Sequence, residues 1–247
     1  MRTIRTRNGP FTERPHFQLR EIEEVCSSEL RKVDLYPSEP EAIRIDRFVE
    51  KRLNISPRYE QLPAGVLGFT RFEGGRVAEI VVSQALDEEG TKVAERRLRS
   101  TLAHEAGHGL LHAYLFALGE KPKGLFDDGD HTPRILCREV IEASRVTSKP
   151  KVHWSEFQAN RAIGALLMPR PLVDRALQEF CIEVGGLGQR TLAADRRDAA
   201  IRALSMIFDV NPVVARLRIE EVFPQKNDGQ GAAVSFFIDT VSTVSLH

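Results

Sequence analysis

Residues 104–108 read His-Glu-Ala-Gly-His, and this stretch decides which fold we expect. Two histidines four residues apart lie on one face of a helix, where both imidazoles can bind a single zinc ion. The glutamate between them projects beside the metal, where its carboxylate can take a proton from a water molecule. The pattern therefore predicts a helix that carries His104 and His108 as zinc ligands and Glu105 as a general base.

The flanking sequence predicts that this helix is long and buried. Between Lys92 and Leu118 there is no proline, and apolar residues recur with a helical period. The polar residues from position 101 onward form one stripe: Thr101, His104, Glu105, His108 and His112. A polar stripe on a buried helix needs partners, and a metal ion is one. The alternative is a pair of core histidines that hydrogen-bond to neighbours, but the glutamate at the catalytic offset favours the metal.

A catalytic zinc needs a third protein ligand, and His112 does not qualify. It lies two helical turns beyond His104, about 12 Å along a straight axis, which is too far to share a tetrahedral ion. We expect His112 to line the pocket or to form a hydrogen bond. Leu111 and Tyr114 occupy the positions where a metzincin carries glycine and histidine, so that class is excluded.

The better third ligand is Glu156. Residues 154–169 are predicted to form a helix, with Ser155 as the N-cap and Pro169 as the stop. Glu156 and Asn160 are one turn apart and share a face. Glu156 can bind zinc, and Asn160 can accept a hydrogen bond from a zinc-bound histidine and so fix its tautomer. Spacing alone leaves an amphipathic surface helix with a solvated glutamate as the alternative.

These motifs resemble the ImmA/IrrE family of metallopeptidases. The resemblance rests on His104-Glu-Ala-Gly-His108 with the following Gly-Leu-Leu-His112, and on Glu156-x-x-Ala-Asn160 running into Ala165-Leu-Leu-Met-Pro169. It spans roughly residues 35–222. It implies a zincin-like α+β fold, with a small antiparallel sheet packed on the buried helix. It also implies a gluzincin-type site in which His104, His108 and Glu156 bind Zn²⁺ and Glu105 is the base. Members are typically intracellular, and some cleave helix-turn-helix repressors.

The chain departs from the family pattern in three places. It has a long connection between His112 and Glu156, which we expect to be a lid or an extra helix, because residues 135–146 have helical character. The acidic loop at residues 127–131 within it is expected to be solvated. Gln158 stands where an acidic residue is usual, and we expect little effect because this position is neither ligand nor base. There is also no amino-terminal helix-turn-helix module.

Composition fits a cytoplasmic enzyme. The 247 residues include 35 basic and 35 acidic side chains, so no global field attracts nucleic acid or an acidic membrane. No apolar run approaches the length of a membrane span, and no secretion signal follows the basic amino terminus. Cys26, Cys137 and Cys181 fit reduced thiols in a cytosol. Cys137 is either a buried thiol or an inhibitory fourth metal ligand.

Four regions are expected along the chain. They are a flexible basic arm (1–15), a zincin-like metallopeptidase domain (16–170), a helical subdomain (171–224) and a tail that could form a strand (225–247). Within the second region, helices are predicted at 17–33 and 41–53 and strands at 65–72 and 78–83. The turn Glu73-Gly-Gly-Arg76 should join the two strands as a hairpin.

The helical subdomain resembles a helix-turn-helix. Helices are predicted at 171–184 and 195–208, separated by a glycine-rich loop. The next helix follows a tight turn, with Asn211 as its N-cap, and carries Arg216 and Arg218. The neutral charge balance favours a packing role for this pair over DNA binding.

The sequence thus predicts a zinc-dependent endopeptidase that cleaves a protein or peptide, such as a helix-turn-helix repressor of a phage, mobile element or stress regulon. The alternative is a regulatory DNA- or protein-binding module whose zinc site is sensory or structural. Tyr114, His131 and His153 are unranked candidates for stabilising the oxyanion.

Overall fold

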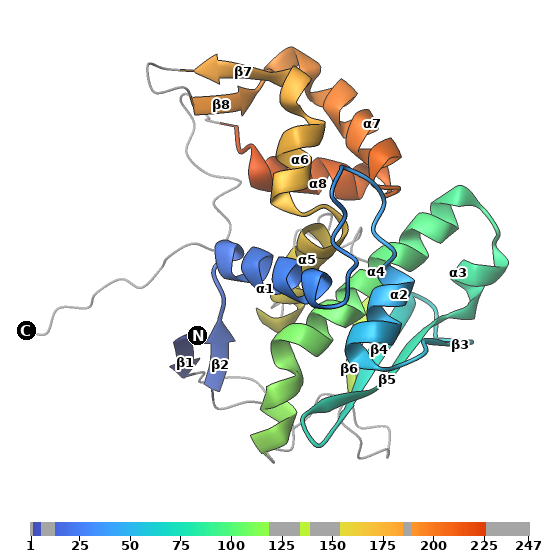
Figure 1. Ribbon diagram of the computed structural model, residues 1–247. Coiled ribbons are helices and arrows are strands. Elements are labelled where there is room, and N and C mark those ends of the chain that lie inside the picture. The colour runs from blue at the N-terminus through green and yellow to red at the C-terminus, as the bar shows by residue number, and fades with distance from the viewer. Residues whose placement is uncertain (1, 6–12, 119–133, 139–153, 185–188, 226–247) are drawn as a thin grey trace, which may run out of the picture.

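A four-stranded sheet and the long helix α4 (Lys92–His112) form the centre of the structure (Figure 1). This computed structural model describes residues 2–5, 13–118, 134–138, 154–184 and 189–225. One cluster of buried apolar side chains runs from α1 (Leu19–Lys32) through α4 and α5 (Trp154–Leu167) to the carboxy-terminal helices. The predicted α+β class is confirmed.

The sheet contains the predicted hairpin. Strands β4 (Val66–Glu73) and β5 (Arg76–Ser83) pair antiparallel, and Gly74 and Gly75 take the positive φ values, 55° and 77°, that their turn requires. The strand order is β3-β5-β4-β6, with β3 at Arg58–Glu60 and β6 at Arg134–Arg138. The sheet is mixed and not wholly antiparallel as predicted. Strand β4 follows β3 in the sequence and runs in the opposite direction, and β5 reverses the direction again. Strands β3 and β5 are therefore parallel, and they are neighbours in the sheet.

Helix α4 is anchored at its start and buried in its second half. The Thr91 hydroxyl caps it by accepting a hydrogen bond from the Ala94 amide at 3.1 Å. From Thr101 to Gly109 every residue is buried, because the sheet contacts one side of the helix and α5 the other. This position places the polar stripe between two packed elements.

Shorter elements complete the amino-terminal part: α2 (Ile45–Phe48), the π-helical turn η1 (Val49–Leu53), α3 (Gln84–Glu88) and the 3₁₀ segment η2 (Ala113–Leu118). The predicted helix at 41–53 therefore begins later than expected, at residue 45. Asn54 ends it in the left-handed conformation, with φ of 57°.

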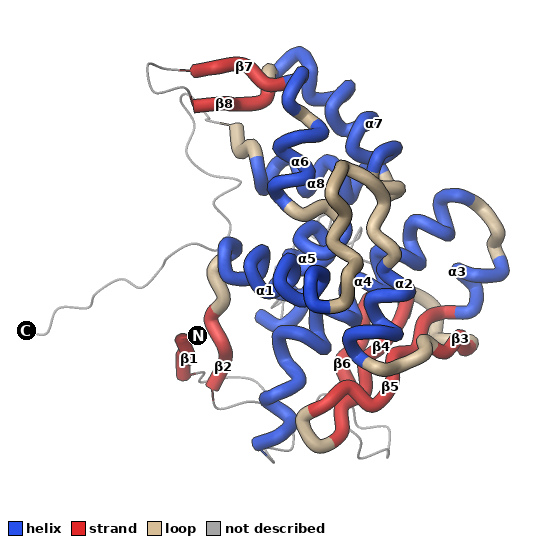
Figure 2. Tube along the Cα trace, viewed as in Figure 1, coloured by secondary structure: helices blue, strands red, loops and turns tan. Residues whose placement is uncertain are grey.

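A second group of helices lies at the top of the view (Figure 2). It contains α6 (Arg170–Ala176), α7 (Arg197–Ile207), α8 (Pro212–Val222), the 3₁₀ turns η3 (Gln178–Phe180) and η4 (Ala194–Arg196), and strands β7 (Cys181–Val184) and β8 (Gln189–Leu192). The prediction of a helix over 171–184 is wrong at its end. Residues 181–184 pair with β8 across the glycine-rich loop, which satisfies their backbone groups without a helix.

Three other local predictions need correction. Residues 2–5 form β1 (Arg2–Arg5), which pairs with β2 (Glu13–His16), so the backbone of the expected arm is partly paired. Residues 134–138 form a strand and not a helix, because they cover the free edge of β4. Ser155 is buried inside α5 instead of capping it, because the helix already begins at Trp154. The predicted tail lies beyond the described residues, apart from Gln225.

Candidate metal centre

Three side chains from two packed helices converge at the centre of the fold. His104 and His108 come from α4, and Glu156 comes from the first turn of α5. The two Nε2 atoms lie 3.0 Å apart, and each is 3.3 Å from one oxygen of the Glu156 carboxylate. The histidine side chains are at most 1% exposed, whereas that of Glu156 is 26% exposed. This group could hold a metal ion.

The donors fit a small divalent cation. Bonds of about 2.0–2.2 Å in a tetrahedral site place ligand atoms about 3.3 Å from one another, close to the separations found in this cluster. Burial opposes the charge on Glu156, but His108 and His104 lower the pKa of its carboxyl far below the ordinary value. The cluster therefore offers two imidazole nitrogens and one carboxylate anion, a donor set that zinc accepts.

Each histidine has an outer partner that sets the direction of its ring. His104 Nδ1 lies 3.0 Å from Asn160 Oδ1, the contact that the sequence predicted. His108 Nδ1 lies 3.0 Å from His112 Nδ1, so His112 is a hydrogen-bonding residue and not a ligand. Burial lowers the pKa of His112 to about 3, which keeps this ring neutral. Both candidate ligands thus present Nε2 to the centre.

Gln158 makes a contact that the sequence did not predict. Gln158 is buried, and its Oε1 lies 2.9 Å from Nε2 of His112. The side chain is neither ligand nor base, as expected, but it contacts a residue that lies behind the cluster. Gln158 lies between Glu156 and Asn160 on the same helix, which indicates that it is near the cluster. This spacing does not identify His112 as its hydrogen-bond partner.

Glu105 is buried beside the cluster with half of its carboxylate unpaired. The Thr70 hydroxyl of β4 donates to Oε2 at 2.6 Å. Oε1 is buried and has no hydrogen-bond partner among the described residues. Burial raises the pKa of Glu105 to about 8, while nearby His104 lowers it and Glu156 raises it. An unpaired buried oxygen in this place is suited to receive a hydrogen from a bound molecule.

Gly68 of β4 makes room for this carboxylate. A Cβ atom at Gly68 would lie 2.9 Å from the Thr101 methyl, 2.9 Å from the Val81 carbonyl oxygen and 3.3 Å from Glu105 Oε1. The strand can approach the helix this closely only without a side chain. A glycine inside a predicted strand is a signal of such a close approach, but the sequence alone does not identify the helix that comes near.

Gly107 allows α5 to reach the cluster. A Cβ atom at Gly107 would lie 2.7 Å from the Ala162 methyl and 3.3 Å from the Ala159 carbonyl oxygen. Small residues on both helices thus permit the close crossing that carries Glu156 to the histidines. A glycine inside a helix lowers the stability of that helix. Its presence at position 107 was therefore a signal of close packing, which the sequence analysis did not use.

We expect Gly107→Ala to weaken metal binding about tenfold or more, by analogy with the loss of supporting contacts around metal ligands. Carbon atoms in contact lie about 3.5–4.0 Å apart, so the new methyl group must push α5 away by about 1 Å. The separation between Glu156 and the two histidines then increases. Competition with a chromophoric chelator measures the change in affinity.

Gly109→Ala is the matched control, because its Cβ would meet Val77 Cγ2 at 2.8 Å and Leu53, on the side away from α5. Both variants should lose stability, by about 1–3 kcal/mol for overpacking. Only the change at position 107 should alter the affinity for metal. Equal affinities in the two variants would contradict the role of the helix crossing.

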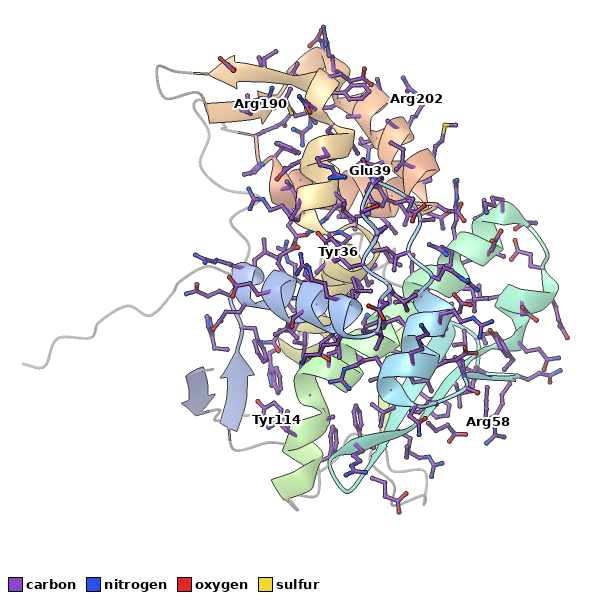
Figure 3. All side chains as sticks on the ribbon, viewed as in Figure 1. Tyr36, Glu39, Arg58, Tyr114, Arg190 and Arg202 are labelled. Carbon is purple, nitrogen blue, oxygen red and sulfur yellow. The ribbon has the colours of Figure 1, made fainter. Side chains whose placement is uncertain are left out.

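The remaining candidates do not join the cluster in the described structure. Tyr114 lies in η2, directly after α4, and its buried hydroxyl has no hydrogen-bond partner among the described residues (Figure 3). His131, His153 and the acidic loop at 127–131 lie outside the described residues. Cys137 pairs through its backbone with Gly68 in the sheet, and its side chain is not described. Cys26 and Cys181 are free thiols.

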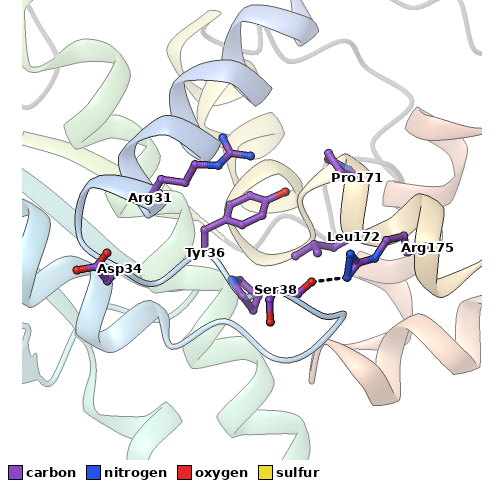
Figure 4. A pocket seen from close by; sticks show the side chains of 8 residues that line it. Arg31, Asp34, Tyr36, Ser38, Pro171, Leu172 and Arg175 are labelled. Atoms are coloured by element: carbon purple, nitrogen blue, oxygen red, sulfur yellow. Dashed lines mark hydrogen bonds between the residues drawn. The ribbon is translucent and has the colours of Figure 1, made fainter.

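A separate cavity of about 490 Å³ lies between the end of α1 and the start of α6 (Figure 4). Its lining residues are Arg31, Asp34, Tyr36, Pro37, Ser38, Pro171, Leu172 and Arg175. The Arg31 guanidinium stacks on the Tyr36 ring at 4.1 Å, and Arg175 donates to the Ser38 carbonyl oxygen. None of the predicted site residues lines this cavity, so it is distinct from the metal cluster.

The helix-turn-helix-like pair is built into the fold. Asp209, in the turn between α7 and α8, accepts hydrogen bonds from Lys92 at 2.8 Å and Arg96 at 2.9 Å, both on α4. Arg218 of α8 is 1% exposed, whereas Arg216 is exposed. One of the two arginines considered for DNA is therefore not at the surface. Asn211 precedes α8 as predicted, but its side chain donates to Val93 O and does not cap the helix.

No family model and no curated protein matches this chain. In the described part of the chain, every helix is too short or too polar to cross a bilayer.

Proposed function

We propose that this protein is a zinc-dependent endopeptidase with a zincin-like fold, related to the ImmA/IrrE metallopeptidases and active in the cytoplasm. The observation that carries the proposal is the combination of a His104–His108–Glu156 cluster with a buried, half-unpaired carboxylate at Glu105. A structural zinc site uses four protein ligands, whereas three residues form this cluster in the described structure. That number supports a catalytic site over a purely structural one.

The residues around the cluster have separate roles in peptide hydrolysis. Zinc, when bound, supplies Lewis acidity toward the scissile carbonyl and makes water more acidic. Glu105 takes a proton from the attacking water and passes it to the leaving amine. Thr70 holds the carboxylate in place by donating to its other oxygen. Asn160 accepts from His104 Nδ1 and so directs the lone pair of Nε2 into the site.

We further propose that the substrate is a regulatory protein, such as a helix-turn-helix repressor of a phage, mobile element or stress regulon. The support is the resemblance of the two helix motifs to a family in which some members cleave such repressors. The alternative, a DNA- or protein-binding module with a sensory or structural zinc site, has less support. The neutral charge balance, the contacts of Asp209 and the burial of Arg218 all favour packing.

The test combines metal analysis with cleavage mapping. The purified chain is stripped with a chelator, reloaded with zinc and analysed by mass spectrometry for metal content. It is then incubated with a proteome-derived peptide library and with purified helix-turn-helix repressors. We expect zinc to bind at one ion per chain and cleavage to require it. His104→Ala should lose both, because a ligand is missing.

Two outcomes would contradict the proposal. A folded chain that remains metal-free in excess zinc has no metal centre. A zinc-loaded chain that cleaves neither the library nor the repressors supports the binding-module alternative. Salt-dependent binding of duplex DNA by the intact chain would then identify DNA as the partner.

A further inference from the structure

A second line of buried polar groups lies behind one of the two histidine ligands. His112 is fully buried at the end of α4, with Nδ1 3.0 Å from His108 Nδ1 and Nε2 2.9 Å from Gln158 Oε1. The Trp154 ring meets the His112 ring edge to face, with centroids 5.3 Å apart. Both ring nitrogens of His112 are thus within hydrogen-bond distance of protein side chains.

Both rings are buried, and a histidine binds metal only in its neutral form, so the hydrogens are placed here for two neutral rings. Two imidazole nitrogens 3.0 Å apart form a hydrogen bond only if one of them carries the hydrogen and the other offers a lone pair. Gln158 presents a carbonyl oxygen, which only accepts, so the hydrogen on a neutral His112 belongs on Nε2. His112 Nδ1 is then an acceptor, and His108 must donate from Nδ1. This leaves the lone pair of His108 on Nε2, the atom that faces the cluster.

We propose that His112 and Gln158 form a relay that holds His108 in the tautomer able to bind metal through Nε2. In this relay residue 158 tunes the affinity of the centre. The proposal rests on the proposed metal centre and concerns two positioning residues that do not touch the ion. His108 donates to His112, and His112 donates to Gln158. This series of hydrogen bonds ends on the amide oxygen of Gln158, which only accepts, so the position of each hydrogen in the series is defined.

The two ligands are supported differently, and both supports come from α5. His104 donates directly to an amide oxygen, that of Asn160, at 3.0 Å. His108 reaches the amide oxygen of Gln158 through an intervening ring. Helix α5 therefore provides one ligand and both terminal acceptors within the span from Glu156 to Asn160. Outer partners of this kind typically change metal affinity about 10- to 100-fold when they are removed.

The first measurement uses the zinc-loaded protein labelled with ¹⁵N in histidine. Two-bond ¹H–¹⁵N spectra distinguish an Nδ1–H ring from an Nε2–H ring. We expect His108 to carry its hydrogen on Nδ1 and His112 to be the Nε2–H tautomer. In Asn160→Leu, the matched control, only the signals of His104 should change. An Nδ1–H tautomer at His112 in the wild-type chain would overturn the relay.

The second measurement is the zinc dissociation constant, obtained by chelator competition. His112→Phe keeps an aromatic ring of similar size but removes the acceptor, and it should weaken binding about 10- to 100-fold. Gln158→Glu replaces the terminal amide by a carboxylate, a stronger acceptor, and should tighten binding several-fold. Gln158→Leu should weaken it. If His112→Phe does not fold, the two substitutions at position 158 still test the relay, because they are expected to change the zinc affinity in opposite directions.

The relay and the proposed function fail in different ways. Unchanged zinc affinity in folded Gln158→Glu and Gln158→Leu would overturn the relay even if the wild-type chain is an active peptidase. A wild-type chain that shows the expected tautomers and affinities but cleaves no peptide would keep the relay and remove the peptidase. Neither measurement depends on the substrate.

Discussion

Replacing Glu105 by glutamine is expected to abolish peptide hydrolysis while the zinc content stays at the wild-type level. The amide has nearly the same size, and its oxygen can still accept the hydrogen bond that Thr70 donates to the carboxylate. It cannot take a proton from water. General acid–base catalysis typically contributes about 10²- to 10⁴-fold, so kcat should fall by at least this factor. Measuring kcat and metal content on the same preparation separates the two effects.

His104→Ala is the control for the metal, because it should lose zinc and activity together. An active Glu105→Gln variant would remove this residue from its role as the base. A variant that loses zinc as well as activity would show that the carboxylate contributes to metal binding and would leave its catalytic role unsupported.

The largest effect on stability is expected for Arg218→Met. The guanidinium is buried, donates to the Met168 carbonyl oxygen at 2.8 and 3.0 Å, and contacts Glu23 at 2.5 Å and Glu221 at 2.6 Å. Burial opposes its charge, but the two glutamates outweigh this and raise the pKa of the guanidinium. Removing one partner of a buried ion pair typically costs about 3–5 kcal/mol, because the remaining charges stay buried.

Urea unfolding of the metal-free chain measures this loss as a change in the free energy of unfolding. Arg216→Met is the matched control, because it makes the same substitution two residues earlier on an exposed position of α8. It should change stability by about 0.5 kcal/mol or less. Equal effects at the two positions would mean that the buried cluster does not hold α8 to the end of α5.

The parts of the structure that depend on local periodicity could be predicted from the sequence. The hairpin followed from two alternating strands around Gly74 and Gly75, and the buried helix followed from its apolar positions. The group formed by His104, His108 and Glu156 was also predicted. Spacing on one helix indicated the two histidines, whereas Glu156 was favoured over a solvated surface glutamate by the resemblance of its helix to the ImmA/IrrE motif.

The remainder depends on contacts between distant segments, which periodicity does not specify. Residues 134–138 and 181–184 become strands only because β4 and β8 offer them backbone partners. The roles of Gly107 and Gln158 depend on how closely α5 crosses α4 and on which side chain faces which. Arg218 is buried because Glu23 and Glu221 lie beside it, and the sequence alone does not show that Glu23, on α1, is near.

The close crossing of α4 and α5 at Gly107 has a consequence for how the ion and the polypeptide depend on each other. Packed small side chains hold the three donors at ligand-like separations, and these contacts do not involve a cation. Zinc fingers, in contrast, are unfolded until they bind metal. In this protein, close packing between two helices sets the positions of the candidate ligands. The affinity for metal should therefore respond to changes in how the two helices pack as well as to changes of the ligands themselves.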